Sequence, residues 1–315
     1  MNLALKGLFG LTALAAITGP AFAQEPEACR TVTFSDVGWT DITATTGVAT
    51  TVLEALGYDT EVKVLSVPVT YTSLASGDID VFLGNWMPTM EADLAPYREK
   101  GTVEVLDEPN LEGAKYTLAT PQYAFDNGLT SFQSIDEFRD ELGGKIYGIE
   151  PGNDGNRLIL DMIEGDQYGL GDFDLVESSE QGMLAQVRRA VQREEPIVFL
   201  AWEPHPMNSN FDIAYLEGGD DVFGPDYGGA TVYTNVRQGY LEACPNVGQF
   251  LRNLSFSLEM ENEIMGKILD DNQEAQAAAT AWLKDNPDAL DGWLDGVTTA
   301  AGEEGLPAAK QALGL

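Results

Sequence analysis

The sequence contains few of the residues that catalysis and metal binding most often use. One histidine, His205, and two cysteines, Cys29 and Cys244, occur among 315 residues. A single histidine cannot form an H-E-x-x-H motif, and two thiols cannot by themselves complete a four-ligand zinc site. The chain also lacks a G-x-S-x-G elbow and the glycine motifs that hold phosphates or dinucleotides. We therefore predict that it is not an enzyme and that it has no cofactor and no metal.

Basic residues are also scarce. The chain has 17 Lys and Arg against 51 Asp and Glu, a formal net charge of -34. A surface of this charge repels nucleic acid and anionic lipid, which argues against both as partners. It could attract a cation, but solubility in a salty medium explains it as well, so the charge says little about function.

No apolar run is long enough to span a membrane. Residues 1–23 contain Lys6, an apolar stretch over 7–17 and the small-residue sequence Ala21-Phe22-Ala23. This order is typical of a cleaved secretory signal, although a buried first helix is the alternative. No later run approaches the roughly 18 to 20 apolar residues that a membrane helix needs. We therefore predict an exported chain whose signal peptide is residues 1–23.

Export would place the two cysteines in an oxidising compartment, where an even pair usually forms a disulfide. A bridge between Cys29 and Cys244 would tie the start of the mature chain to its last third. Both ends of the chain would then belong to one lobe, and the middle would form another.

Short β-branched runs alternate with amphipathic helical patterns, which indicates an α/β fold rich in parallel strands. Strands are predicted at 31–37, 61–65, 78–84, 102–106, 145–150, 174–176 and 197–201. Helices are predicted between them, including one over 42–56 and one that Ser134 begins with a capping box. We expect a discontinuous lobe I over 24–112 and 212–315, a lobe II over 113–211, and a ligand cleft between them.

Aromatic residues follow the predicted strands at the edge where open α/β sheets bind ligands. Trp39, Trp86 and Trp202 each come just after a strand, and Tyr116 stands at the entry to lobe II. Core packing would explain any one of them, but three equivalent positions indicate a site. Trp282 and Trp293 lie instead among apolar residues of terminal helices, where we expect them to pack in the core.

Such a set of rings suits a trimethylammonium group, which cannot donate hydrogen bonds and is attracted to the faces of Trp and Tyr. Asp41 could balance the ligand's charge or accept a hydrogen bond from it, or could merely cap the helix that begins at Ile42. Asn153 lies in a glycine-rich turn from which its amide could point into the cleft.

Several segments together resemble the substrate-binding proteins of quaternary-amine ABC importers, and most of all those that bind choline. These segments are FSDVGWTDI, GNWMPT, KYTLAT, EPGNDGN, LAWEPHPM and AWLKDNP. The resemblance covers essentially the whole mature chain. It implies a type II periplasmic binding protein, a disulfide, an aromatic box of Trp39, Trp86, Tyr116 and Trp202, and polar contacts from Asp41 and Asn153.

The resemblance also implies a periplasmic location, a membrane permease as partner, and choline or a related quaternary ammonium compound as ligand. We expect a monomer that closes its two lobes around that ligand. Asp154 and Glu203 flank the site and could reach the ligand as well. Glycine betaine and carnitine are alternative ligands, and a hydrolase of choline esters or phosphocholine is the alternative of another class. His205 is expected at the rim of the site, on a loop.

Overall fold

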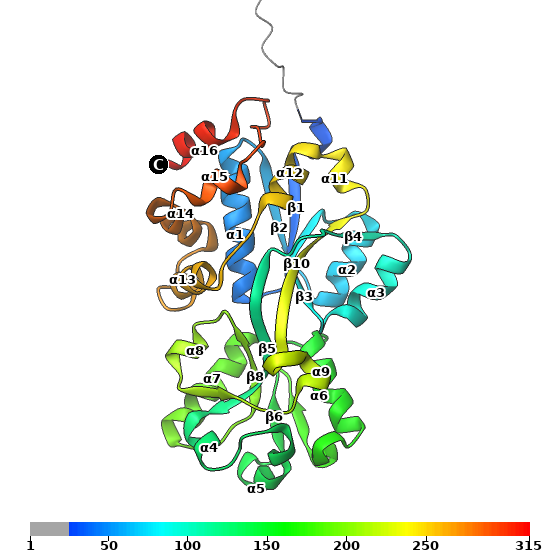
Figure 1. Cartoon of the computed structure of the whole chain (residues 1–315), viewed down its shortest axis with the longest axis vertical. Helices are drawn as coiled ribbons and strands as arrows, with labels where there is room; N and C mark the ends of the chain where they lie inside the picture. The colour runs from blue at the N-terminus through cyan, green and yellow to red at the C-terminus, as the bar shows by residue number, and fades with distance from the viewer. Residues whose placement is uncertain (1–24) are drawn as a thin grey trace, which may run out of the picture.

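The computed structural model describes residues 25–315, and the predicted signal peptide lies outside this range. Among the described residues, no helix is both long and apolar enough to cross a membrane. Figure 1 shows two lobes, one above the other, with β5 and β10 running side by side between them.

Ten strands are hydrogen-bonded into one sheet that extends through both lobes. Their bounds are β1 Thr31–Asp36, β2 Asp59–Val64, β3 Val81–Met87, β4 Val103–Val105, β5 Leu111–Pro121, β6 Lys145–Tyr147, β7 Asp174–Val176, β8 Phe199–Glu203, β9 Ile213–Tyr215 and β10 Gly229–Arg237. The strand order is β2-β1-β3-β10-β5-β8-β6-β7, with β4 also paired to β10 and β9 to β5.

Parallel and antiparallel pairs occupy different parts of this sheet. The pairs β1-β2, β1-β3, β6-β7 and β6-β8 are parallel. Every antiparallel pair includes β5 or β10. The predicted α/β class is therefore confirmed, and the sheet as a whole is mixed because β5 and β10, which join the lobes, run in opposite directions.

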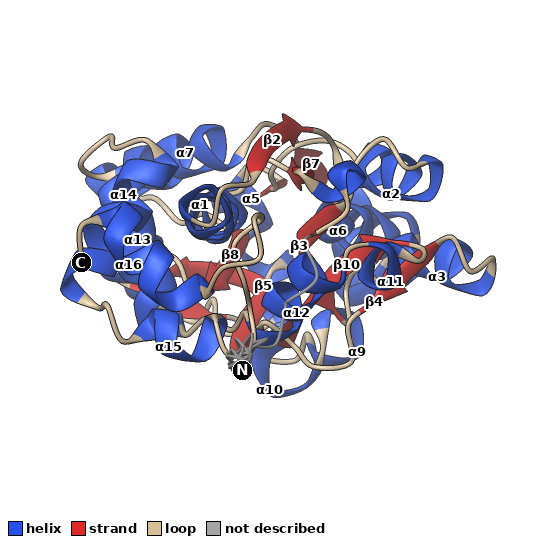
Figure 2. Cartoon of the chain, turned by 90° about the horizontal axis from the view of Figure 1, so that it is seen from above, coloured by secondary structure: helices blue, strands red, loops and turns tan. Residues whose placement is uncertain are grey.

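The first lobe, drawn above in Figure 1, holds β1 to β4 and the terminal helices. Its helices are α1 Thr40–Ala55, α2 Val67–Ser76, α3 Glu91–Glu99, α11 Tyr240–Ala243, α12 Pro245–Asn253, α13 Leu258–Leu269, α14 Ala275–Asp285, α15 Ala289–Trp293 and α16 Gly305–Leu313. Helix α1 is nearly all buried because it packs against α13 and α14 as well as the sheet. Figure 2 shows α1 end-on, beside these two helices.

The second lobe, drawn below in Figure 1, holds β6 to β8 and the remaining α-helices. These are α4 Gln122–Asp126, α5 Arg139–Leu142, α6 Asp154–Glu164, α7 Glu180–Arg193, α8 Met207–Asn210, α9 Asp220–Phe223 and α10 Pro225–Gly228. Short 3-10 helices occur at Glu27–Cys29, Phe132–Ser134, Asp136–Phe138 and Gln167–Asp172.

The capping box predicted at Ser134 is wrong by three residues. Ser131 Oγ accepts from the Ser134 backbone N–H at 3.2 Å, and Ser134 Oγ accepts from the Ser131 N–H at 2.9 Å. This reciprocal pair caps a 3-10 turn, and the expected helix is divided into two such turns and α5.

The predicted lobe boundaries at 112/113 and 211/212 stay predictions, although some contacts bear on the second. Strand β9 pairs with β5, and Phe223 of α9 packs on Phe132 with ring centroids 5.9 Å apart. These contacts keep residues beyond 211 beside the second lobe and favour a return to the first lobe along β10.

The predicted disulfide is confirmed. Cys29 and Cys244 are bonded, with Cα atoms 5.5 Å apart, and both side chains are buried. The bond ties the residues before β1 to the junction of α11 and α12, so it holds together two ends of the first lobe that are 215 residues apart in sequence.

Candidate functional site

A tight turn between β1 and α1 places Trp39. Gly38 has a φ of +83°, a conformation that a side chain would disfavour. Asp36 holds the turn, since its Oδ1 accepts from the Gly38 N–H at 2.7 Å and its Oδ2 accepts from Thr43 Oγ1 at 2.7 Å. Trp39 is consequently the residue before the first turn of α1, with its side chain buried at the end of β1.

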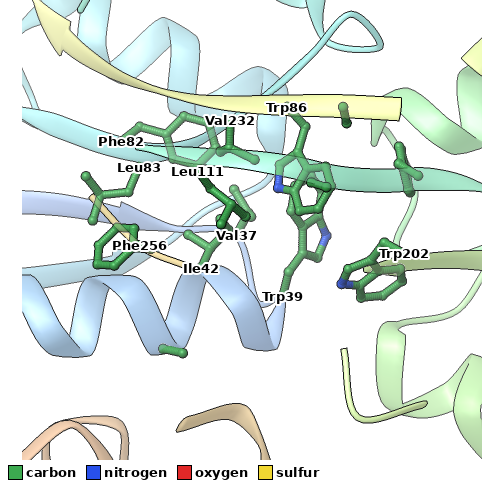
Figure 3. Packing of buried hydrophobic residues seen from close by; sticks show 14 of the residues in the cluster. Val37, Trp39, Ile42, Phe82, Leu83, Trp86, Leu111, Trp202, Val232 and Phe256 are labelled. Carbon is green, nitrogen blue, oxygen red and sulfur yellow. The ribbon is translucent and has the colours of Figure 1, made fainter. Parts of the chain in front are cut away.

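Three further aromatic residues meet Trp39 from neighbouring strands. Trp86 is near the end of β3, Tyr116 is on β5, and Trp202 is directly opposite Tyr116 on β8. The ring centroids of Trp86 and Tyr116 lie 5.9 Å apart, and those of Tyr116 and Trp202 lie 6.4 Å apart in an edge arrangement. In Figure 3 the side chains of Trp86, drawn above, and Trp39, drawn below, point toward the same region, and that of Trp202 lies to their right.

These rings line a narrow cavity of about 10 Å³ in this closed arrangement. Its lining residues are Trp39, Asp41, Trp86, Tyr116, Ile149 and Trp202. Five of the six residues predicted for the ligand site therefore lie together around one cavity. Ile149 was missed, because a single aliphatic residue after a strand carries no signal of its own in the sequence.

Asp41 lines the cavity, and the alternative that it caps α1 is wrong. Helix α1 begins at Thr40, so Asp41 is its second residue and Trp39 takes the N-cap position. Asp41 Oδ2 accepts from Trp86 Nε1 at 3.2 Å, while Oδ1 has no hydrogen-bond partner among residues 25–315. Burial and the nearby Glu180 carboxylate raise the pKa of Asp41 to about 8.

Asn153 lies behind the cavity wall and is not among its lining residues. Its Oδ1 caps α6 by accepting from the Asn156 N–H at 2.8 Å, and it accepts from the Tyr116 hydroxyl at 3.5 Å. Its amide nitrogen donates to the Glu150 carbonyl. In this arrangement Asn153 orients Tyr116, and its direct contact with a ligand stays a prediction.

The two flanking acids differ in their surroundings. Asp154 is fully buried at the start of α6, and burial raises its pKa to about 6. Glu203 is partly exposed and lies 3.7 Å from Lys115 Nζ in an ion pair. Neither residue lines the cavity.

Two glutamates that the sequence interpretation missed cross from the second lobe to the first. Glu150 Oε1 accepts from Trp39 Nε1 at 2.8 Å, and Glu180 accepts from the backbone and hydroxyl of Thr40. Burial raises the pKa of Glu150 to about 7. Farther along, Arg157 Nη2 donates to Asp93 Oδ2 at 2.6 Å. The lobes are thus in contact on several sides of the cavity, which is a closed arrangement.

His205 is buried, so its expected place at the rim is wrong. Its Nε2 lies 3.1 Å from Glu180 Oε1, and its Nδ1 accepts from the Met207 N–H at 2.9 Å. Both ring nitrogens are engaged within the protein, and the ring packs against Trp202 with centroids 4.8 Å apart.

Known proteins match this chain along most of its length. Residues 30–285 match the family described as the substrate binding domain of ABC-type glycine betaine transport systems. A solved ABC-transporter choline binding protein in complex with choline is 67% identical, with a TM-score of 0.90, over 92% of this chain and all of that chain. The structure of such a protein in an unliganded semi-closed conformation has the same identity and coverage and a TM-score of 0.84.

A third similar protein is the glycine betaine/carnitine transport binding protein of Listeria monocytogenes serotype 1/2a (strain 10403S). It is 29% identical over 178 residues, which are 56% of this chain and 57% of that protein.

Proposed function

Because the chain belongs to the family of substrate-binding domains of ABC-type glycine betaine transport systems, we propose that it captures choline for an ABC importer. The observation that carries this proposal is the cavity that Trp39, Trp86, Tyr116 and Trp202 form with the carboxyl group of Asp41. The 67% identity to a protein solved with choline supports the same choice of ligand.

The four aromatic rings would bind the trimethylammonium end of choline. Its charge is spread over methyl groups that donate no conventional hydrogen bond, so aromatic faces bind it better than a cluster of polar groups would. Each dry ring contributes up to about 2 kcal/mol. The cavity draws its rings from both lobes, since Trp39 and Trp86 belong to the first lobe and Trp202 to the second.

Asp41 would interact with both the positive charge and the hydroxyl group of choline. Its Oδ1, which has no hydrogen-bond partner within residues 25–315, can accept a hydrogen bond, and its negative charge pairs with a cation. Glycine betaine carries a carboxylate that an ionised Asp41 would repel, which favours choline. Glycine betaine and carnitine are the alternative ligands, supported by the family description and by the Listeria relative.

We propose that the protein acts in the periplasm and that it captures its ligand by closing its two lobes. Residues 1–23 have the pattern of a secretory signal, and the disulfide suits an oxidising compartment. A ligand that contacts rings of both lobes stabilises the closed form, and the membrane permease of the importer then receives that form. We expect the protein to act as a monomer whose lobes follow the predicted boundaries, except that the second crossing lies in β10.

Binding without turnover is part of the proposal. A hydrolase that used histidine as its general base would need one ring nitrogen free to reach a nucleophile or a water molecule. His205 is the single histidine of the chain, and both of its ring nitrogens contact other protein groups. This arrangement supports a structural role for His205.

Calorimetric titration of the mature protein with choline, glycine betaine, carnitine and phosphocholine tests the proposal. We expect the tightest binding for choline and no product in a parallel assay. Asp41→Asn should weaken choline binding more than betaine binding, because it removes a charge that attracts the former and repels the carboxylate of the latter. Tighter binding of betaine to the wild type would make betaine the ligand, and turnover would refute a pure binding role.

A further inference from the structure

Helix α1 begins without a cap from its own neighbourhood. Its N-cap residue is Trp39, whose side chain makes no capping hydrogen bond. The first N–H groups of a helix have no partner inside the helix, and leaving such a donor buried and unpaired is costly. The N–H of Thr40 is at this position, and Thr40 is buried.

Glu180, which lies 140 residues away in the other lobe, provides the missing acceptor. Its Oε2 accepts from the Thr40 N–H at 2.8 Å, and its Oε1 accepts from Thr40 Oγ1 at 2.6 Å. Glu180 is available for this role because Ser179, and not Glu180, caps its own helix α7, with Ser179 Oγ accepting from the Gly182 N–H at 3.1 Å.

A third donor connects the same carboxylate to the second-lobe wall of the cavity. Since His205 Nδ1 accepts from the Met207 N–H, the Nε2 atom of a neutral ring carries the proton and donates to Glu180 Oε1 at 3.1 Å. The ring of His205 packs on Trp202 at an interplanar angle of 75°. Glu180 therefore reaches the segment that holds Trp39 and Asp41 and, through His205, the ring of Trp202.

We propose that Glu180 is a positioning residue of the ligand site, which fastens the two lobes by capping α1 from the opposite side of the cavity. This inference rests on the proposed function, because the role of Glu180 is to determine how long the closed form retains the ligand. Opening of the lobes breaks the bonds to Thr40 and keeps the bond to His205, which is in the same lobe. The contact with Thr40 consequently acts on ligand release more than on capture.

Glu180→Gln tests this role with little change of shape. Glutamine has one acceptor oxygen and a donor group, so it cannot accept from the N–H and hydroxyl of Thr40 and from His205 together. We expect choline release, followed by stopped-flow tryptophan fluorescence, to be faster by about tenfold or more, because hydrogen bonds to a charged group are lost. The association rate should change by less than about threefold.

A double-mutant cycle separates this role from general destabilisation. Thr40→Val removes the hydroxyl donor and keeps the shape of the side chain, while Thr40→Ser keeps the donor and should restore slow release. The effects of Thr40→Val and Glu180→Gln should be less than additive, since both break the same contact. Glu263→Gln is the matched control, because Glu263 also accepts a hydrogen bond, from Trp282 Nε1 at 2.7 Å, but lies away from the cavity.

Each result has a defined meaning. Unchanged release in Glu180→Gln, or fully additive effects with Thr40→Val, would overturn the inference while leaving choline binding in place. Absence of choline binding by the wild type would refute the proposed function instead. The inference would then be decided without ligand, by small-angle scattering, in which Glu180→Gln should give a larger radius of gyration than wild type and Glu263→Gln should not. Should Glu180→Gln fail to fold, Thr40→Val and Thr40→Ser provide the same readouts.

Discussion

The tryptophans of the cavity and those of the terminal helices are equally buried but differently partnered. Trp282 and Trp293 stack, with centroids 6.4 Å apart and planes at 24°, and their indole N–H groups donate to Glu263 and to the Ser255 carbonyl. Around the cavity the indoles of Trp39 and Trp86 donate to carboxylates, and Trp202 Nε1 has no partner among residues 25–315.

The difference teaches how to distinguish packing from binding. Trp282 and Trp293 stack on each other, and both of their indole N–H groups have protein acceptors. The cavity rings instead converge from both lobes on a buried acid, Asp41, whose second oxygen has no partner in the described part of the chain. All five tryptophans are less than 10% exposed, so burial alone does not separate the two groups.

The largest expected effect belongs to the packing group. Trp293→Ala should lower the free energy of unfolding by about 3 to 5 kcal/mol, the usual cost of removing a large buried ring. Choline affinity of the folded fraction should stay within about twofold of wild type. Denaturant unfolding and calorimetric titration provide the two values. A loss of affinity comparable to that of a cavity mutant would remove the distinction between the groups.

The second effect belongs to the cavity group and has the opposite pattern. Trp202→Ala should weaken choline binding more than tenfold, in keeping with a cation–π contribution of up to about 2 kcal/mol. Its loss of stability should be smaller than that of Trp293→Ala, since Trp202 lines the ligand cavity whereas Trp293 stacks on Trp282. Trp202→Phe, which keeps a ring, is the control and should bind with intermediate affinity. Full affinity in Trp202→Ala would show that the rings are not the binding surface.

The smallest expected effect is a pH dependence of choline affinity that comes from the acid beside the cavity rings. Asp41 is buried there, whereas Glu263, the acid beside the stacked tryptophans, is exposed. Burial raises the pKa of Asp41 to about 8, and a bound cation lowers it again, so choline binding should release a proton. Affinity should therefore rise with pH, by at most about tenfold per unit, and level off above about pH 8. Titrations in buffers of different ionisation enthalpy measure the released proton.

The raised pKa of Asp41 also makes the stability of the ligand-free protein depend on pH, with the opposite sign. A carboxyl whose pKa is raised by folding stabilises the folded state at low pH, and this contribution is lost as pH rises toward about 8. Asp41→Asn should reduce both pH dependences, and Glu263→Gln should leave them unchanged. A pH-independent affinity in the wild type would mean that Asp41 is already ionised before choline enters.

Much of the fold could be predicted because strands and helices have local periodic patterns. Strand β7 was predicted at its observed residues, and most other predicted strands overlap the observed ones. Strands β5, β9 and β10 were missed. Strand β10 pairs with β3, β4 and β5, all more than 100 residues earlier, and no local pattern reports such pairings.

The sequence by itself determined which aromatic residues meet, because side chains that end neighbouring strands come to the same edge of a sheet. It also determined the disulfide partners, since two cysteines in an oxidising compartment have one possible pairing. The tertiary structure decided which acids accompany the rings: Glu150 and Glu180 reach Trp39 and Thr40 from segments 111 and 140 residues away. It decided the raised pKa of Asp41 as well, because desolvation and neighbouring charge exist only once the chain has folded.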